Sequence, residues 1–181
     1  LFVTEKSGME NLHHEGVSES KIFFTGNVMI DSLIYYMPKI NNSDILTSLG
    51  LKKQQYILST FHRPSNVDHP ERLRKILENM KHLATSLPVI FPIHPRTRNN
   101  IKHFGLENIL SEKVILLDPV GYLDFLALTK RAALVLTDSG GIQEETTFMG
   151  VPCITVRNNT ERPVTCDVGT NYLAGRDYEK A

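Results

Sequence analysis

The chain has 181 residues, of which 41% are hydrophobic, and its 20 basic and 20 acidic side chains leave no net charge at pH 7. This length is sufficient for a well-packed domain. The balanced charge provides no basic surface of the kind that binds nucleic acid or an anionic membrane. No apolar run approaches the length of a membrane span, and no signal-peptide pattern opens the chain. The composition therefore favours a soluble globular protein with neither nucleic acid nor a membrane as its partner.

The two cysteines, Cys153 and Cys166, lack the spacing of a metal site, and Cys153 lies in an apolar run. We expect buried, unpaired thiols of a cytosolic protein. His13 and His14 are adjacent and cannot share one helix face, so we expect no metal site there. The chain starts at Leu1 and stops shortly after a strand-like segment at residues 172–174. We therefore expect a piece of a longer protein.

The pattern of the first 50 residues predicts an entry segment with interdomain helices. A strand end at 1–4, a helix at 6–15 ended by Gly16 and a strand at 22–25 come first. A second helix then opens at Gly26 and is expected to end at Pro38, because proline disrupts a helix interior. Residues 41–44 predict a loop with an N-cap, followed by a short helical turn before Gly50.

From residue 51 onward the pattern alternates between strands and helices. Strands are expected at 56–60, 89–93, 114–117, 132–136 and 153–156, and helices at 71–83, 99–104, 121–130 and after residue 141. Residues 62–70 and 94–98 are expected to be loops. Leu73, Ile76, Leu77 and Met80 have the spacing of a buried helix face. Short connections between alternating elements predict an α/β fold, a Rossmann-like parallel sheet with helices on both faces over residues 51–181.

Polar residues gather in the five loops that follow the predicted strands. These loops begin at Phe61, His94, Asp118, Asp138 and Arg157. The carboxyl ends of parallel strands meet at one edge, where such sheets bind their ligands. Arginine, histidine and a helix N-terminus at one edge suit a ligand that carries phosphates.

The turn at residues 137–145 allows two interpretations. Ser139, Gly140 and Gly141 leave backbone N–H groups uncrowded at a helix N-terminus, which suits a phosphate. Alternatively, Asp138 or Ser139 is a helix N-cap, with Gln143 or Glu144 closing a capping box. The other polar loops at the same edge favour the phosphate.

Individual side chains near this edge also leave alternatives open. His62 and Arg63 follow a strand directly, which favours a functional over a structural role. Glu145 is either a carboxylate that binds ribose hydroxyls or an exposed group favoured by the helix dipole. Phe125 either stacks on a base or belongs to the core. Glu161 and Arg162 allow a weak surface ion pair.

Several enzyme signatures are missing from the sequence. Residues 138–141 lack the leading glycine of a nucleophile elbow, which argues against a serine hydrolase. The chain has no P-loop and no Gly-x-Gly-x-x-Gly segment after a strand.

Taken together, these segments resemble the non-hydrolysing UDP-N-acetylglucosamine 2-epimerases. The resemblance lies in residues 25–31, 60–68, 92–97, 119–122, 137–145 and 160–163, in that order. It implies one half of a GT-B-like fold of two Rossmann-like domains. By this resemblance the chain is the C-terminal, UDP-binding half, without the N-terminal half and the extreme C-terminus.

The resemblance implies that UDP-GlcNAc and UDP-ManNAc are interconverted by anti elimination and syn re-addition of UDP, without a cofactor. It places His62, Ser139, Gly140, Gly141 and Arg162 around the phosphates and the reaction centre, with His62 as the catalytic residue. It further places Glu145 at the ribose, Phe125 near the uracil, and Arg63 and His94 at an allosteric site for a second UDP-GlcNAc. The expected protein is a cytoplasmic homodimer. This chain alone is expected to bind UDP weakly without epimerising, because the carboxylates associated with proton transfer belong to the other half.

Two positions depart from the family pattern: Ser65 and Val164 stand where glutamate is usual. Ser65 therefore puts in doubt the allosteric activation that the resemblance implies. Three alternatives remain open: an epimerase of a UDP-2,3-diacetamido uronic acid sugar, a GT-B glycosyltransferase, and a sugar-nucleotide sensor without catalysis.

Overall fold

The computed structural model describes residues 1–175. The chain divides into two compact units, Leu1–Pro38 and a second unit that begins at Lys39. In the first unit, β1 (Phe2–Val3) and β2 (Phe23–Phe24) pair in parallel. Between them lie α1 (Lys6–His14) and a 3-10 helix (Glu19–Lys21). Gly16 follows α1 with a φ of 78°, as the predicted helix end requires.

Helix α2 (Val28–Asn41) continues past the proline that was expected to end it. This prediction was wrong for a local reason: Pro38 lies in the last turn and removes only one helical N–H donor. Ile40, which follows it, is fully buried. Burial of this side chain stabilises the last turn and offsets the missing hydrogen bond.

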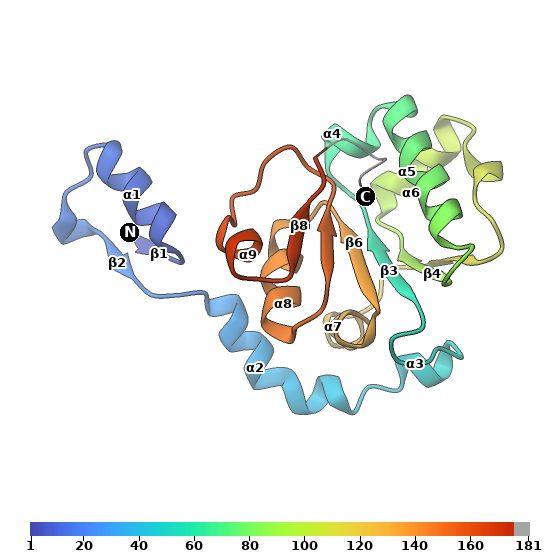
Figure 1. The fold of residues 1–181 in the computed structure, drawn as a ribbon, viewed down its shortest axis with the longest axis horizontal. Coiled ribbons are helices and arrows are strands. Elements are labelled where there is room, and N and C mark those ends of the chain that lie inside the picture. Colours follow the sequence, from blue (N-terminus) through green and yellow to red (C-terminus); the bar gives the residue numbers. More distant parts are fainter. Residues whose placement is uncertain (176–181) are drawn as a thin grey trace. The chain divides into compact units, whose positions relative to one another are not determined.

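The second unit contains a six-stranded, wholly parallel sheet in the order β5-β4-β3-β6-β7-β8 (Figure 1). This confirms the predicted Rossmann-like sheet. The strand order reverses between β3 and β6, which pair from Ile57↔Leu134 to Thr60↔Thr137. In doubly wound sheets, ligands bind outside the carboxyl ends of the strands at such a reversal. The strands are β3 (Ile57–Thr60), β4 (Val89–Pro92), β5 (Val114–Leu117), β6 (Leu134–Thr137), β7 (Cys153–Thr155) and β8 (Asn171–Leu173).

Helices cover both faces of this sheet because alternate residues of its inner strands are buried on opposite sides (Figure 1). Ile57 and Phe91 pack in the cluster that contains the predicted apolar face of α5 (Pro70–Leu83), which is confirmed, and Ile101 of α6 (Pro95–His103). Leu58 and Ile90 pack in the cluster of α7 (Tyr122–Arg131) and α8 (Gly140–Met149). The remaining helices are short: α3 (Ile45–Ser48), α4 (Pro64–Val67), a 3-10 turn (Glu107–Ile109) and α9 (Val164–Asp167).

Two segments that were expected to be loops contain helix. Helix α4 lies inside the predicted loop at 62–70, and α6 begins at Pro95 rather than at residue 99. In both cases a proline occupies the first helical turn, where its fixed φ fits and its missing N–H costs nothing. At α6, His94 is the N-cap, and its Nδ1 accepts a hydrogen bond from the backbone N–H of Arg96 at 3.2 Å.

Gly150 ends α8 in the left-handed region, with a φ of 69°. Because a Cβ is disfavoured there, we expect Gly150→Ala to lower the free energy of unfolding by about 1 kcal/mol in urea titrations. Gly150→Asn is the matched control and should cost less, since asparagine tolerates this conformation. Equal losses in the two variants would contradict the conformational explanation.

Candidate functional site

Helix α8 begins directly after β6, and no side chain caps its first turn. Ser139 is the N-cap residue and makes no side-chain capping hydrogen bond. Gln143 instead donates from Nε2 to the carbonyl of Ser139 at 3.1 Å, so the predicted capping box is wrong. The N–H groups of the first turn are therefore not satisfied by a cap, which is the condition under which a helix N-terminus binds an anion.

Asp138 is fully buried and turns towards the loop after β3 instead of capping α8. Its carboxylate accepts hydrogen bonds from the backbone N–H groups of His62 at 3.2 Å and Arg63 at 3.0 Å, and from Nδ2 of Asn66 at 3.1 Å. Asn66 also donates to the carbonyl of Val156, which follows β7. Asp138 thus connects the loops on both sides of the strand-order reversal. This role was not predicted from the sequence, although an acidic residue that ends a buried strand was a signal for it.

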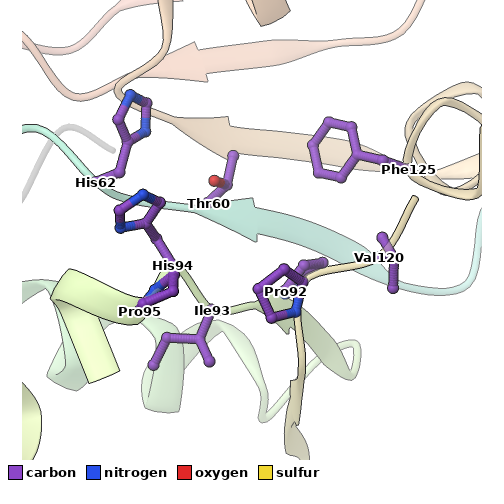
Figure 2. A pocket seen from close by; sticks show the side chains of 9 residues that line it. Thr60, His62, Pro92, Ile93, His94, Pro95, Val120 and Phe125 are labelled. Atoms are coloured by element: carbon purple, nitrogen blue, oxygen red, sulfur yellow. The ribbon is translucent and has the colours of Figure 1, made fainter. Parts of the chain in front are cut away.

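A pocket of about 180 Å³ opens beside this loop (Figure 2). The rings of His62 and His94 have centroids 5.9 Å apart in its wall. Most of the remaining lining is apolar, as in sites that bind a planar ring. Phe125 lines this pocket and also packs against the core cluster of α7 and α8, so its place in the core is confirmed and stacking on a base stays a prediction. The lining consists of Thr60, His62, Pro92, Ile93, His94, Pro95, Pro119, Val120 and Phe125.

Glu161 lies between two arginines and against the start of α8. Its carboxylate pairs with Nη2 of Arg63 at 2.9 Å and with Nη2 of Arg157 at 2.7 Å. Its hydrogen bond with Arg157 is the largest cause that lowers the pKa of Glu161 to about 2. A Cβ on Gly140 would lie 2.7 Å from Oε1 of Glu161. A side chain at position 140 would therefore displace the carboxylate end of Glu161.

Arg162 pairs with Glu144 of α8 at 3.0 Å, so the expected ion pair between Glu161 and Arg162 was wrong. Glu161 is instead paired with Arg63 and Arg157. Thr160 fixes the loop by donating to Oε1 of Gln143 at 2.6 Å. Asn171 of β8 donates to the same oxygen at 3.1 Å. The loop after β7 is thereby held over the first turns of α8.

Glu145 is almost buried, with 5% of its surface exposed, which is at odds with the exposed carboxylate considered above. Burial raises its pKa to about 7, and the neighbouring charge of Glu144 contributes further. A carboxylate in such surroundings gains strongly from a hydroxyl donor, because a hydrogen bond replaces part of its lost hydration.

The structure brings most of the predicted site residues together. His62, Arg63, Ser139, Gly140, Gly141 and Arg162 lie on the loops that follow β3, β6 and β7 or at the start of α8, while His94 and Phe125 line the pocket with His62. Glu145 is set apart from the pocket wall, one turn into α8. Asn66, Asp138, Glu144 and Arg157 are further site residues that were not predicted from the sequence.

Among residues 1–175, no cluster of potential metal ligands is found. No helix of this part is long and apolar enough to cross a membrane.

Comparison with known proteins places the chain in a family. The sequence profile described as UDP-N-acetylglucosamine 2-epimerase matches residues 1–181. The UDP-N-acetylglucosamine 2-epimerase of Methanocaldococcus jannaschii is 42% identical over 99% of this chain and 51% of its own length. The UDP-2,3-diacetamido-2,3-dideoxy-D-glucuronate 2-epimerase of Pseudomonas aeruginosa is 41% identical over 97% of this chain and 48% of its own length. The chain therefore spans about half the length of these relatives.

Solved structures give the same result. The M. jannaschii UDP-GlcNAc 2-epimerase in complex with UDP-GlcNAc and UDP superimposes with a TM-score of 0.92, over 99% of this chain and 51% of that one. The Neisseria meningitidis UDP-GlcNAc 2-epimerase bound to UDP-GlcNAc, at 30% identity, has a TM-score of 0.82 over 94% of this chain and 48% of that one. The chain belongs to the UDP-N-acetylglucosamine 2-epimerase family and corresponds to the C-terminal half of its GT-B-like fold.

Proposed function

We propose that this chain is the UDP-binding half of an enzyme that interconverts UDP-GlcNAc and UDP-ManNAc by elimination and re-addition of UDP. The observation that carries the proposal is the uncapped N-terminus of α8 at the strand-order reversal, with Arg63, Arg162 and an apolar pocket in the adjoining loops. This combination suits a nucleoside diphosphate, since it offers N–H donors and arginines for phosphates and a flat apolar wall for a base. Relatives of known structure were solved with UDP-GlcNAc or UDP.

In this proposal each part of UDP has its own protein partners. The N–H groups of Gly140 and Gly141 and the side chains of Ser139 and Arg162 bind the diphosphate, whereas the N–H of Ser139 already donates to Oγ1 of Thr137 at 3.0 Å. Glu145 accepts hydrogen bonds from the ribose hydroxyls, and Phe125 contacts the uracil.

His62 acts at the reaction centre, beside the diphosphate. Arg63 and His94 belong to a site for a second, activating UDP-GlcNAc. That site adjoins the first, since Arg63 pairs with the carboxylate that lies against Gly140, and His94 shares a pocket wall with His62.

The elimination step builds negative charge on the departing UDP. Preorganised N–H groups and an arginine stabilise this charge most when it is fully developed, which lowers the barrier to elimination. The same contacts hold UDP for its return to the sugar. The chemistry needs no redox cofactor. The carboxylates that exchange the proton at C2 come from the rest of a longer, cytoplasmic, homodimeric protein.

A second candidate substrate is a UDP-2,3-diacetamido uronic acid sugar. The relative named for that activity is 41% identical to this chain, against 42% for the M. jannaschii UDP-GlcNAc 2-epimerase. Both substrates carry UDP, so the contacts described above serve either one.

Incubating the complete protein that carries this chain with UDP-GlcNAc alone tests the activity. We expect UDP-ManNAc to form, as followed by NMR of the sugar protons. A glycosyltransferase would leave UDP-GlcNAc intact without an acceptor, and a sensor would bind it without turnover. Turnover of only the diacetamido uronate substrate would favour the second candidate.

Arg162→Ala should weaken UDP binding roughly tenfold in calorimetry. A charge-assisted hydrogen bond to phosphate is worth about 1.5–3 kcal/mol, and in wild type part of this gain is offset because Arg162 gives up its ion pair with Glu144 when UDP binds. The matched control is Arg98→Ala, which removes an exposed arginine paired with Asp118 at 2.6 Å. An unchanged affinity in Arg162→Ala would remove this residue from the proposed site.

A further inference from the structure

Each of the two histidines in the pocket of Figure 2 contacts another group of the chain through its Nδ1 atom. The partner of His94 is a hydrogen-bond donor, whereas the partner of His62 is an acceptor. Nδ1 of His94 accepts the backbone N–H of Arg96 at 3.2 Å. A neutral imidazole accepts at one nitrogen only when its proton is on the other. His94 therefore carries its proton on Nε2.

Nδ1 of His62 lies 3.3 Å from Oδ1 of Asp138. Asp138 is fully buried, and its orientation is fixed by N–H donors from His62, Arg63 and Asn66. A bare Nδ1 would set its lone pair against those of a carboxylate oxygen, whereas a protonated Nδ1 is attracted to it. This contact favours the tautomer with the proton on Nδ1, and Nε2 then holds the free lone pair.

We infer that the pocket contains a matched pair of imidazoles, in which His62 accepts a hydrogen bond or a proton at Nε2 and His94 donates one from Nε2–H. Asp138 is the positioning residue that selects the tautomer of His62. The ring centroids are 5.9 Å apart, so the two rings lie where the two proposed ligand sites adjoin.

The ligands that match this pair offer a hydroxyl or amide N–H to His62 at the first site and an anionic oxygen to His94 at the adjoining one. A sugar joined to a diphosphate has both groups. This assignment of the ligand rests on the proposed function, whereas the two tautomers rest only on the contacts within the chain.

The test is two-bond ¹H–¹⁵N NMR of the labelled chain at pH 8.5, above the ordinary pKa of imidazole, with His62 and His94 assigned by His62→Gln and His94→Gln. Protonated and bare ring nitrogens resonate far apart, so each tautomer is read directly. We expect the proton on Nδ1 in His62 and on Nε2 in His94. The same tautomer in both rings, or a doubly protonated His62, would overturn the inference.

A comparison of variants tests the positioning role of Asp138 separately. Asp138→Asn should abolish the preference of His62 for Nδ1–H and leave His94 unchanged, while Asp118→Asn, at an exposed ion pair, should change neither ring. A His62 tautomer that is unaffected in folded Asp138→Asn would remove the role of Asp138. Should that variant not fold, the wild-type spectrum still decides between the two tautomers.

Titrating the wild-type chain with UDP separates the inference from the proposed function. Shifts of the His62 ring signals are expected on binding, because His62 lies beside the diphosphate. If UDP does not bind while the two tautomers are as described, the proposed function fails and the imidazole pair stands. If UDP binds and the tautomers are identical, the pair fails and the proposed function stands.

Discussion

Asp138→Ala is expected to lower the free energy of unfolding by about 3 kcal/mol, among the largest effects of a single side chain in this protein. The change deletes a fully buried carboxylate and leaves the N–H groups of His62 and Arg63 and the amide of Asn66 without their acceptor. A buried donor without a partner, such as the amide of Asn66, costs roughly 1–3 kcal/mol, and the part-buried N–H groups of His62 and Arg63 cost less because water and rearrangement of the loop recover part of the loss. Urea unfolding followed by circular dichroism measures the loss.

Two further variants make this result specific. Asp118→Ala removes an exposed carboxylate that pairs with Arg98, and it should change stability by no more than about 0.5 kcal/mol. Asp138→Asn should lie in between, because an amide keeps one acceptor but turns its NH₂ towards other donors. A loss below about 1 kcal/mol in Asp138→Ala would show that this carboxylate does not hold the loop.

Glu145→Gln is expected to stabilise the protein at alkaline pH and not at acidic pH. Burial raises the pKa of Glu145 to about 7 in the folded chain, from 4.5 as the ordinary value. The folded chain therefore favours the protonated carboxyl of Glu145. The contribution of this group to the free energy of unfolding is present in full below pH 4.5 and is lost as the pH rises through 7. The pKa difference corresponds to about 3 kcal/mol, which wild type loses by pH 8 and Glu145→Gln does not.

Urea unfolding at pH 4.5 and at pH 8 measures this difference, with the exposed Glu78→Gln on α5 as the control. The gap between Glu145→Gln and wild type should widen between the two pH values, and the gap for Glu78→Gln should stay constant. A constant gap for Glu145→Gln would show that Glu145 is not desolvated as the structure indicates.

In the proposed site, where Glu145 binds the ribose, the same carboxylate links ligand binding to pH. Ribose hydroxyls stabilise the charged form, so UDP-GlcNAc should bind about tenfold more tightly at pH 8 than at pH 6 through this group, as its ionised fraction rises. UDP-GlcNAc is the suitable probe because its esterified diphosphate does not titrate in this range. In Glu145→Gln this component of the pH dependence should disappear, and an unaltered profile would argue against ribose binding by Glu145.

Much of the fold follows from local sequence patterns. Continuous apolar runs identified the buried strands, and the spacing of Leu73, Ile76, Leu77 and Met80 identified the inner face of α5. The strand-order reversal between β3 and β6 was not predicted, because pairing between distant strands leaves no local pattern. The errors at Pro38 and at residues 94–98 concern helix ends, where the burial of Ile40 and the cap from His94 outweighed the expected breaks.

The site was predicted less completely than the fold. Polar residues at strand ends indicated His62, Arg63, His94 and the glycine turn, since parallel strands end at one edge. The partners of Asp138 and Glu161 could not be predicted, because they join loops that lie far apart in the chain. The two residues of each such contact lie far apart in the sequence, and they meet only when the sheet has folded.

The central claim, that UDP binds where the strand order reverses, is tested most directly by amide ¹H–¹⁵N spectra of this chain during titration with UDP. The account predicts that the signals of Ser139, Gly140, Gly141, His62 and Phe125 shift together along one saturating curve. Signals of the exposed groove at Lys81, Thr85 and Lys113, on the second unit but away from the site, should stay in place. Shifts confined to other residues, or none at millimolar UDP, would contradict the account.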